Sequence, residues 1–87
     1  MAILTAKQLR QLRVHPLGGY NNRLAAAIRI TKTVQSEMAK ATGLSQQYIS
    51  DVANARYRTI TVERAHVFAD FFGCLIEDLF PKLNNGE

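Results

Sequence analysis

Two adjacent glutamines, Gln46 and Gln47, begin a short segment of mixed polar and apolar residues that also contains Ser50 and Asp51. A glutamine amide offers a donor and an acceptor in one plane, which matches the N6 and N7 edge of adenine in the major groove. Asp51 can accept a hydrogen bond from cytosine N4, and Ser50 can contact a base or a phosphate. These four side chains are therefore candidates for contacts with DNA bases.

The four candidates share one face if residues 46–53 form a helix. At about 100° per residue they lie on one side. The other side holds the apolar half of the segment, namely Tyr48, Ile49, Val52 and Ala53. Gly43 can end a preceding helix in the left-handed conformation, and Ser45 can accept from the free N–H groups of the next one. The spacing predicts a helix-to-helix corner followed by a recognition helix, although an ordinary solvated helix face is the alternative.

Residues on either side of this face are suited to the DNA backbone. Gln35 stands near the start of the preceding helix, where an amide and free backbone N–H groups can bind a phosphate together. Arg56 and Arg58 follow the recognition helix in a basic loop. We expect backbone contacts from six residues: Gln35, Ser45, Tyr48, Arg56, Tyr57 and Arg58. For the two tyrosines, simple packing is the alternative.

The charge of the chain is unevenly distributed. The net charge is +4 over 87 residues, but residues 1–59 carry nine Lys and Arg against two acids, which is +7, and residues 60–87 carry two against five, which is −3. A basic N-terminal part and an acidic C-terminal part are expected of a protein that binds a polyanion with one of its surfaces. A chance asymmetry of a solvated surface is the alternative.

The composition argues against several other classes of protein. No apolar run approaches the roughly 20 residues that span a bilayer, and no secretory signal is visible, so we expect a cytoplasmic protein. The single cysteine, Cys74, lies in an apolar context and is expected to be a small core residue. His66, Asp70 and Cys74 are a poor metal-binding set, and no catalytic arrangement stands out. We expect no enzyme activity, no cofactor and no metal.

Apolar residues recur at three- and four-residue spacing between Gly, Asn, Thr and Pro, which predicts an all-helical chain. The expected caps are Asn21 or Asn22, Thr33, Ser45 and Thr61, with Gly73 at a helix end. A first weak helix is interpreted as an appendage. The expected helices cover residues 5–14, 23–30, 34–41, 46–53, 62–72 and 76–80.

The helix at 62–72 carries more large apolar side chains than one face can bury. Phe68 and Phe72 are expected in the core. Phe71 or Val67 is then a candidate dimer contact, because large apolar side chains on a surface often mark an interface.

At this point the chain resembles the Xre/Cro-type helix-turn-helix repressors of bacteria and phages. The family pattern T-Q-x-x-[LM]-A-x-x-x-G-[VL]-[ST]-Q-x-Y-[IV]-S-x-[IV] is matched by VQSEMAKATGLSQQYISDV, and AHVFADFFGCLIEDLF resembles the family's closing helix pair. The resemblance covers about residues 22–80. It implies a compact five-helix lambda repressor-like domain at 21–81, here with a short N-terminal helical extension at 1–20 and a tail at 82–87.

The resemblance also implies a function. It indicates a sequence-specific regulator of transcription that binds double-stranded DNA, as a homodimer on a near-palindromic operator, and most simply represses. The chain departs from the family where Ala53, Asn54 and Ala55 replace the common Glu-x-Gly, so Asn54 is expected to supply the left-handed residue. Ile28 would then replace the Arg that pairs with the missing Glu, unless a shorter loop puts Arg29 there. The rival hypothesis is a protein-interaction module, such as an antitoxin that binds its partner through the Phe-rich C-terminal helices.

Overall fold

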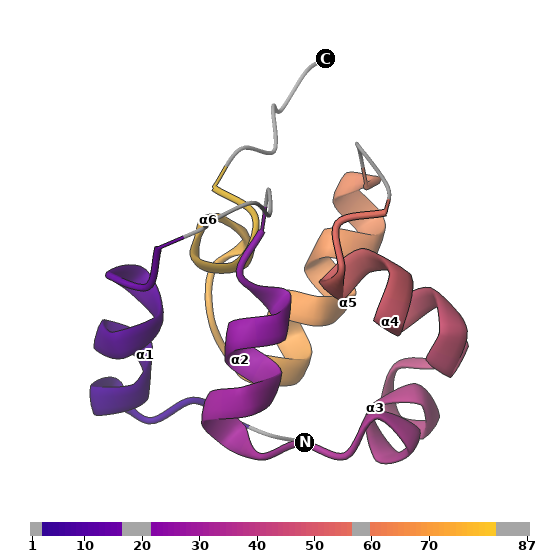
Figure 1. Cartoon of the computed structure of the whole chain (residues 1–87), viewed down its shortest axis with the longest axis horizontal. Coiled ribbons are helices and arrows are strands. Elements are labelled where there is room, and N and C mark those ends of the chain that lie inside the picture. The colour runs from indigo at the N-terminus through magenta and orange to yellow at the C-terminus, as the bar shows by residue number, and fades with distance from the viewer. Residues whose placement is uncertain (1–2, 17–21, 57–59, 82–87) are drawn as a thin grey trace.

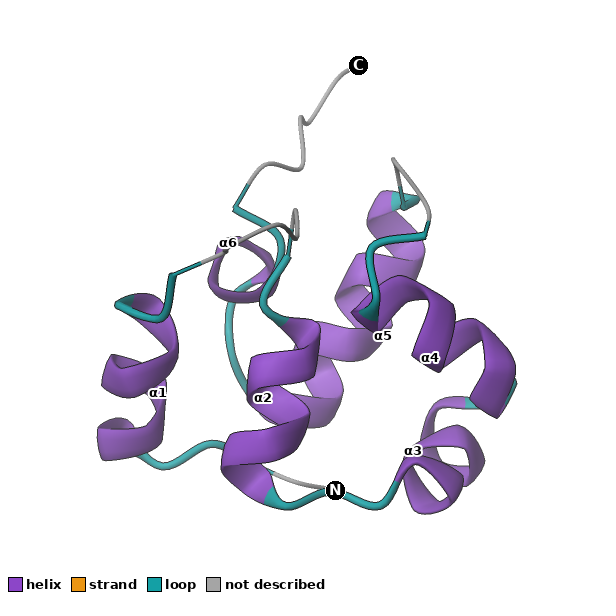
Figure 2. Ribbon diagram, viewed as in Figure 1, coloured by secondary structure: helices purple, strands orange, loops and turns teal. Residues whose placement is uncertain are grey.

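The computed structural model describes residues 3–16, 22–56 and 60–81, and it confirms an all-α fold. Six helices are present in these residues (Figures 1 and 2). Their bounds are α1 Ala6–Arg13, α2 Leu24–Thr31, α3 Gln35–Thr42, α4 Gln46–Ala53, α5 Val62–Phe72 and α6 Ile76–Leu79. No helix in the described part of the chain is long and apolar enough to cross a membrane. In Figure 1, α1 lies on one side of the molecule and α3 and α4 lie on the other.

The corner between α3 and α4 forms as the sequence predicts. Gly43 ends α3 with a φ of 75°, a left-handed conformation that a residue without a Cβ adopts at little cost. Ser45 then caps α4, because its side chain accepts a hydrogen bond from the backbone N–H of Tyr48 at 3.0 Å. Further along the chain, Thr61 caps α5 and Gly73 ends it, as expected. Local residues therefore set where α4 starts and how it turns away from α3.

One expected cap is wrong, and another acts from one residue further back. Thr33 does not cap α3, because Val34 is the N-cap residue and no side chain caps the helix. The Thr33 hydroxyl instead contacts that of Thr31. Asn22 stands one residue before the N-cap of α2, yet its Oδ1 accepts from the Leu24 N–H at 3.0 Å, so it satisfies a helix-terminal donor as a cap would.

The first helix is not an appendage. It begins with a capping box, in which Thr5 Oγ1 accepts from the Gln8 N–H and Gln8 Oε1 accepts from the Thr5 N–H. Leu12 is fully buried and Leu4 is nearly so. The Leu4 N–H donates to the Phe72 carbonyl at 2.9 Å, which ties the segment before α1 to the end of α5. The N-terminal segment thus completes the same core as the helix-turn-helix.

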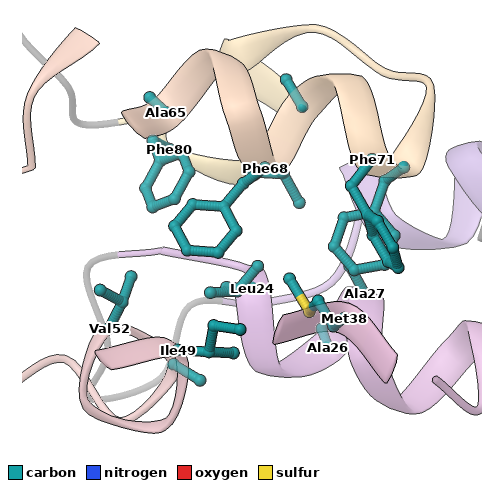
Figure 3. Packing of buried hydrophobic residues seen from close by; sticks show 14 of the residues in the cluster. Leu24, Ala26, Ala27, Met38, Ile49, Val52, Ala65, Phe68, Phe71 and Phe80 are labelled. Atoms are coloured by element: carbon teal, nitrogen blue, oxygen red, sulfur yellow. The ribbon is translucent and has the colours of Figure 1, made fainter. Parts of the chain in front are cut away.

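The core is one cluster to which all six helices contribute. Figure 3 shows the part of it between α2, α3, α4 and α5. Phe68 and Phe72 are fully buried, as expected. Phe71 is also buried, at 6% exposed, and it packs edge-on against Phe72 with ring centroids 5.0 Å apart. The expectation that Phe71 lies on the surface is therefore wrong, because helical spacing shows which side chains are apolar and not which neighbours cover them. Val67 is half-buried.

An ion pair joins the first and last helices. Arg13 Nε donates to Asp78 Oδ1 at 2.8 Å, and Asp78 Oδ2 accepts from the Leu75 N–H at 3.0 Å. Burial raises the pKa of Asp78, but the hydrogen bonds from Arg13 and Leu75, together with the charges of Arg13 and Arg23, lower it by more, so its carboxyl has a pKa below the ordinary value. The carboxylate is buried and charged because both of its oxygens are satisfied.

Candidate nucleic-acid interface

Helix α4 has the two faces that the sequence predicts. Its apolar side, with Ile49, Val52 and Ala53, is buried against the core. Figure 3 shows Ile49 and Val52 directed toward the side chains of the other helices. On the opposite side Gln46 and Gln47 are exposed. The predicted division of α4 into a polar and an apolar face is therefore correct. The two glutamines lie at the N-terminal end of α4, next to the corner with α3.

The other two polar residues of α4 are less open than the glutamines. Ser50 and Asp51 are half-buried. Ser50 Oγ lies 3.4 Å from the Nδ2 of Asn54, which also donates to the Ser50 carbonyl at 2.9 Å. Asp51 Oδ1 accepts from Gln47 Nε2 at 3.0 Å and lies 3.5 Å from a guanidinium nitrogen of Arg56. Both residues are thus held by neighbours on the same helix or just after it.

Tyr48 faces the core side of α4. Its ring stacks on Phe68 with centroids 6.5 Å apart, and the guanidinium of Arg64 lies 4.8 Å from the Tyr48 ring centre. Tyr48 therefore has a packing role, which was the alternative to a contact with the DNA backbone. Such a contact stays a prediction. Arg64 itself was not expected near the recognition helix. The guanidinium of Arg64, on α5, lies over the ring of Tyr48, on α4. No local sequence pattern predicts such a contact between two helices.

The residues expected at the DNA backbone flank α4 on both sides. Gln35 is half-buried at the first position of α3, where the helix has no side-chain cap. Uncapped N–H groups at a helix start, together with the positive end of the helix dipole, favour an anion. Arg56 is exposed directly after α4. Tyr57 and Arg58 lie outside the described residues, so their expected contacts stay predictions.

The turn after α4 differs from the expectation. Asn54 has a φ of −90°, and Ala55 is the left-handed residue, with a φ of 57°. Ala55 therefore occupies a conformation that costs a residue with a Cβ about 1–2 kcal/mol. At the family's ion-pair position, Ala53 is buried and Ile28 packs partly against the core, while Arg29 is exposed.

Asn22 is a residue of this site that the sequence analysis considered only as a cap. It is buried, and its Nδ2 donates to the Val52 carbonyl at 2.9 Å while its Oδ1 accepts from Leu24. One amide thus joins the start of α2 to the end of α4. Because a buried amide needs partners for both its donor and its acceptor, this pair of bonds restrains how α4 lies on the domain.

Cys74 is half-buried, and burial raises the pKa of its thiol to about 12. A thiol with so high a pKa is protonated at neutral pH and is a poor nucleophile. The geometry therefore favours a packing role for Cys74 over a reactive one.

Comparison with protein families agrees with this geometry. The helix-turn-helix family HTH_3 matches residues 35–79, from the first residue of α3 to the last of α6. No curated protein and no solved structure matches the chain. The match covers the corner, the recognition helix and the closing helix pair. The chain belongs to the HTH_3 helix-turn-helix family of Xre-type, lambda repressor-like DNA-binding regulators.

Proposed function

We propose that the protein is a transcriptional repressor that binds a near-palindromic operator as a homodimer in the cytoplasm, without a cofactor. Gln46 and Gln47 read base edges from the major groove. Gln35, the hydroxyl of Ser45 and Arg56 hold the flanking phosphates, and we extend this set to Tyr48, Tyr57 and Arg58. Val67, half-buried on α5, is the remaining candidate for a dimer contact.

One observation carries this proposal. The two glutamines are exposed side by side at the capped start of an amphipathic helix whose other face is anchored in the core. A rigid support and a free polar end are what base reading in the major groove requires. The basic residues before position 60 add the attraction to phosphate that does not depend on sequence.

The test is a selection from random-sequence duplexes, followed by fluorescence anisotropy between about 50 and 200 mM salt. We expect enrichment of a two-fold symmetric site with half-sites about one helical turn apart. The double variant Q46A/Q47A should keep its fold and its salt-dependent binding but lose at least about tenfold in preference for that site, since each bidentate contact is worth roughly 1–3 kcal/mol.

Gln11→Ala provides the matched control. Gln11 is an exposed glutamine on α1, which lies on the far side of the domain from α4 (Figure 1). This variant should select the same site with unchanged affinity. Full sequence selectivity in Q46A/Q47A would refute the assignment of the reading face, and weak, unselective binding by the wild type would refute the function itself.

The interaction-module hypothesis has lost its main argument. It relied on Phe71 as a surface residue of the Phe-rich C-terminal helices, whereas Phe71 is buried, like the other phenylalanines of this region. We therefore propose no docking surface on these helices.

A further inference from the structure

We propose that Asp51 is a positioning residue that orients the amide of Gln47 and makes it selective for adenine over guanine, and that Asp51 does not itself read a base. This inference rests on the proposed function, because it concerns the same reading face. It replaces the sequence-based expectation of a contact between Asp51 and cytosine.

The hydrogen bond between Gln47 and Asp51 fixes which way the amide points. Gln47 Nε2 donates to Asp51 Oδ1 at 3.0 Å. A carboxylate can only accept, so the nitrogen of the amide and not its oxygen must face Asp51. One of the two Nε2 hydrogens is used in this bond. The second hydrogen and Oε1 stay available to a base.

Asp51 is in turn held by the chain that follows α4. Its side chain is only 19% exposed, and Arg56 lies 3.5 Å from the same Oδ1 oxygen. The Arg56 N–H donates to the Asp51 carbonyl at 2.9 Å, across the turn in which Ala55 has a positive φ. The position of Arg56 therefore depends on the turn as well as on its charge. An acid recessed in this way, with a cation at its oxygen, is poorly placed to reach a base edge.

The fixed orientation discriminates between purines. Adenine presents a donor at N6 and an acceptor at N7, which match Oε1 and the remaining Nε2 hydrogen of Gln47. Guanine presents two acceptors, O6 and N7, so a glutamine binds both only by donating both Nε2 hydrogens. Asp51 already occupies one of them. Gln46 has no such partner among the described residues, so the proposed selectivity applies to Gln47 alone.

The test compares Asp51→Ala, Gln47→Ala and the double variant with the wild type in the duplex selection. We expect D51A to bind random DNA at least as tightly as the wild type, because a negative charge near phosphates is removed. Its adenine preference over guanine should fall about tenfold at one base pair in each half-site. Q47A should lose preference at the same base pair, and the double variant should lose no more than Q47A, because the two residues act through one contact.

Glu37→Ala is the matched control for charge. Glu37 is an exposed acid in the first turn of α3, so its removal changes the net charge equally without touching Gln47. It should leave the adenine preference intact. Circular dichroism melting of each variant checks that the fold is retained. An altered preference in D51A at a base pair different from that of Q47A would show that Asp51 reads a base, and an unchanged preference would show that it does not orient Gln47. Either result overturns the proposal.

A measurement without DNA separates this inference from the proposed function. In a ¹⁵N–¹H spectrum, the two side-chain amide protons of Gln47 should be more widely separated in the wild type than in D51A, because only one of them is hydrogen-bonded. Absence of that change overturns the orientation by Asp51, whatever the selection shows. Failure of the wild type to select any DNA sequence, with the change present, would overturn the proposed function and leave the orientation standing.

Discussion

Replacing Leu12 with alanine tests whether α1 belongs to the core in solution. Leu12 is fully buried, although it lies outside the segment that matches the family. Loss of a fully buried leucine costs about 2–5 kcal/mol, the sum of the lost transfer free energy and the cavity left behind. A domain of this size has a total stability of roughly 4–13 kcal/mol. Leu12→Ala should therefore remove a large part of the stability of the whole domain.

The assay is urea denaturation followed by circular dichroism, with thermal melting alongside. A loss of about 3 kcal/mol corresponds to a fall in Tm of roughly 12–24 °C. Val14→Ala is the matched control, because Val14 follows α1 but is 82% exposed. It should change stability by no more than about 0.5 kcal/mol. Equal, small effects of the two substitutions would refute the docking of α1 and restore its interpretation as an appendage.

Two further predictions concern an ion pair and a turn. The pKa of Asp78 is lower in the folded protein than in the unfolded chain, where it is about 3.9. The ionised carboxylate therefore stabilises the fold at pH values above about 3.9, and this stabilisation is lost as the pH falls through the pKa of the folded protein. Asp78→Asn should thus reduce the unfolding free energy by on the order of 1 kcal/mol at pH 7 and by progressively less as the pH falls below about 3.9. A loss that is equal at neutral and at acidic pH in urea titrations would contradict this. Ala55→Gly should stabilise the protein by up to about 1 kcal/mol, because it relieves a left-handed alanine at a smaller cost in chain entropy, and a lowered urea midpoint would refute the strain argument.

The sequence by itself determined the features that depend on neighbouring residues. Ser45 and Thr61 begin their helices, and Gly43 and Gly73 end theirs, because capping and positive φ act within one turn of the chain. The two faces of α4 follow from the helical period alone, and the structure has the same two faces. These local rules were enough to predict the helix-turn-helix and the exposed glutamines.

Only the tertiary structure decided which surfaces are covered. Phe71 is buried, and α1 is part of the core. Residues from both ends of the chain meet, as in the hydrogen bond between Arg13 and Asp78, which are 65 positions apart. Asn22 likewise reaches Val52, 30 residues away. Helical spacing predicts which side of a helix is apolar but not which helix covers it. Contacts between distant residues depend on how the helices pack, and that packing is a property of the whole domain.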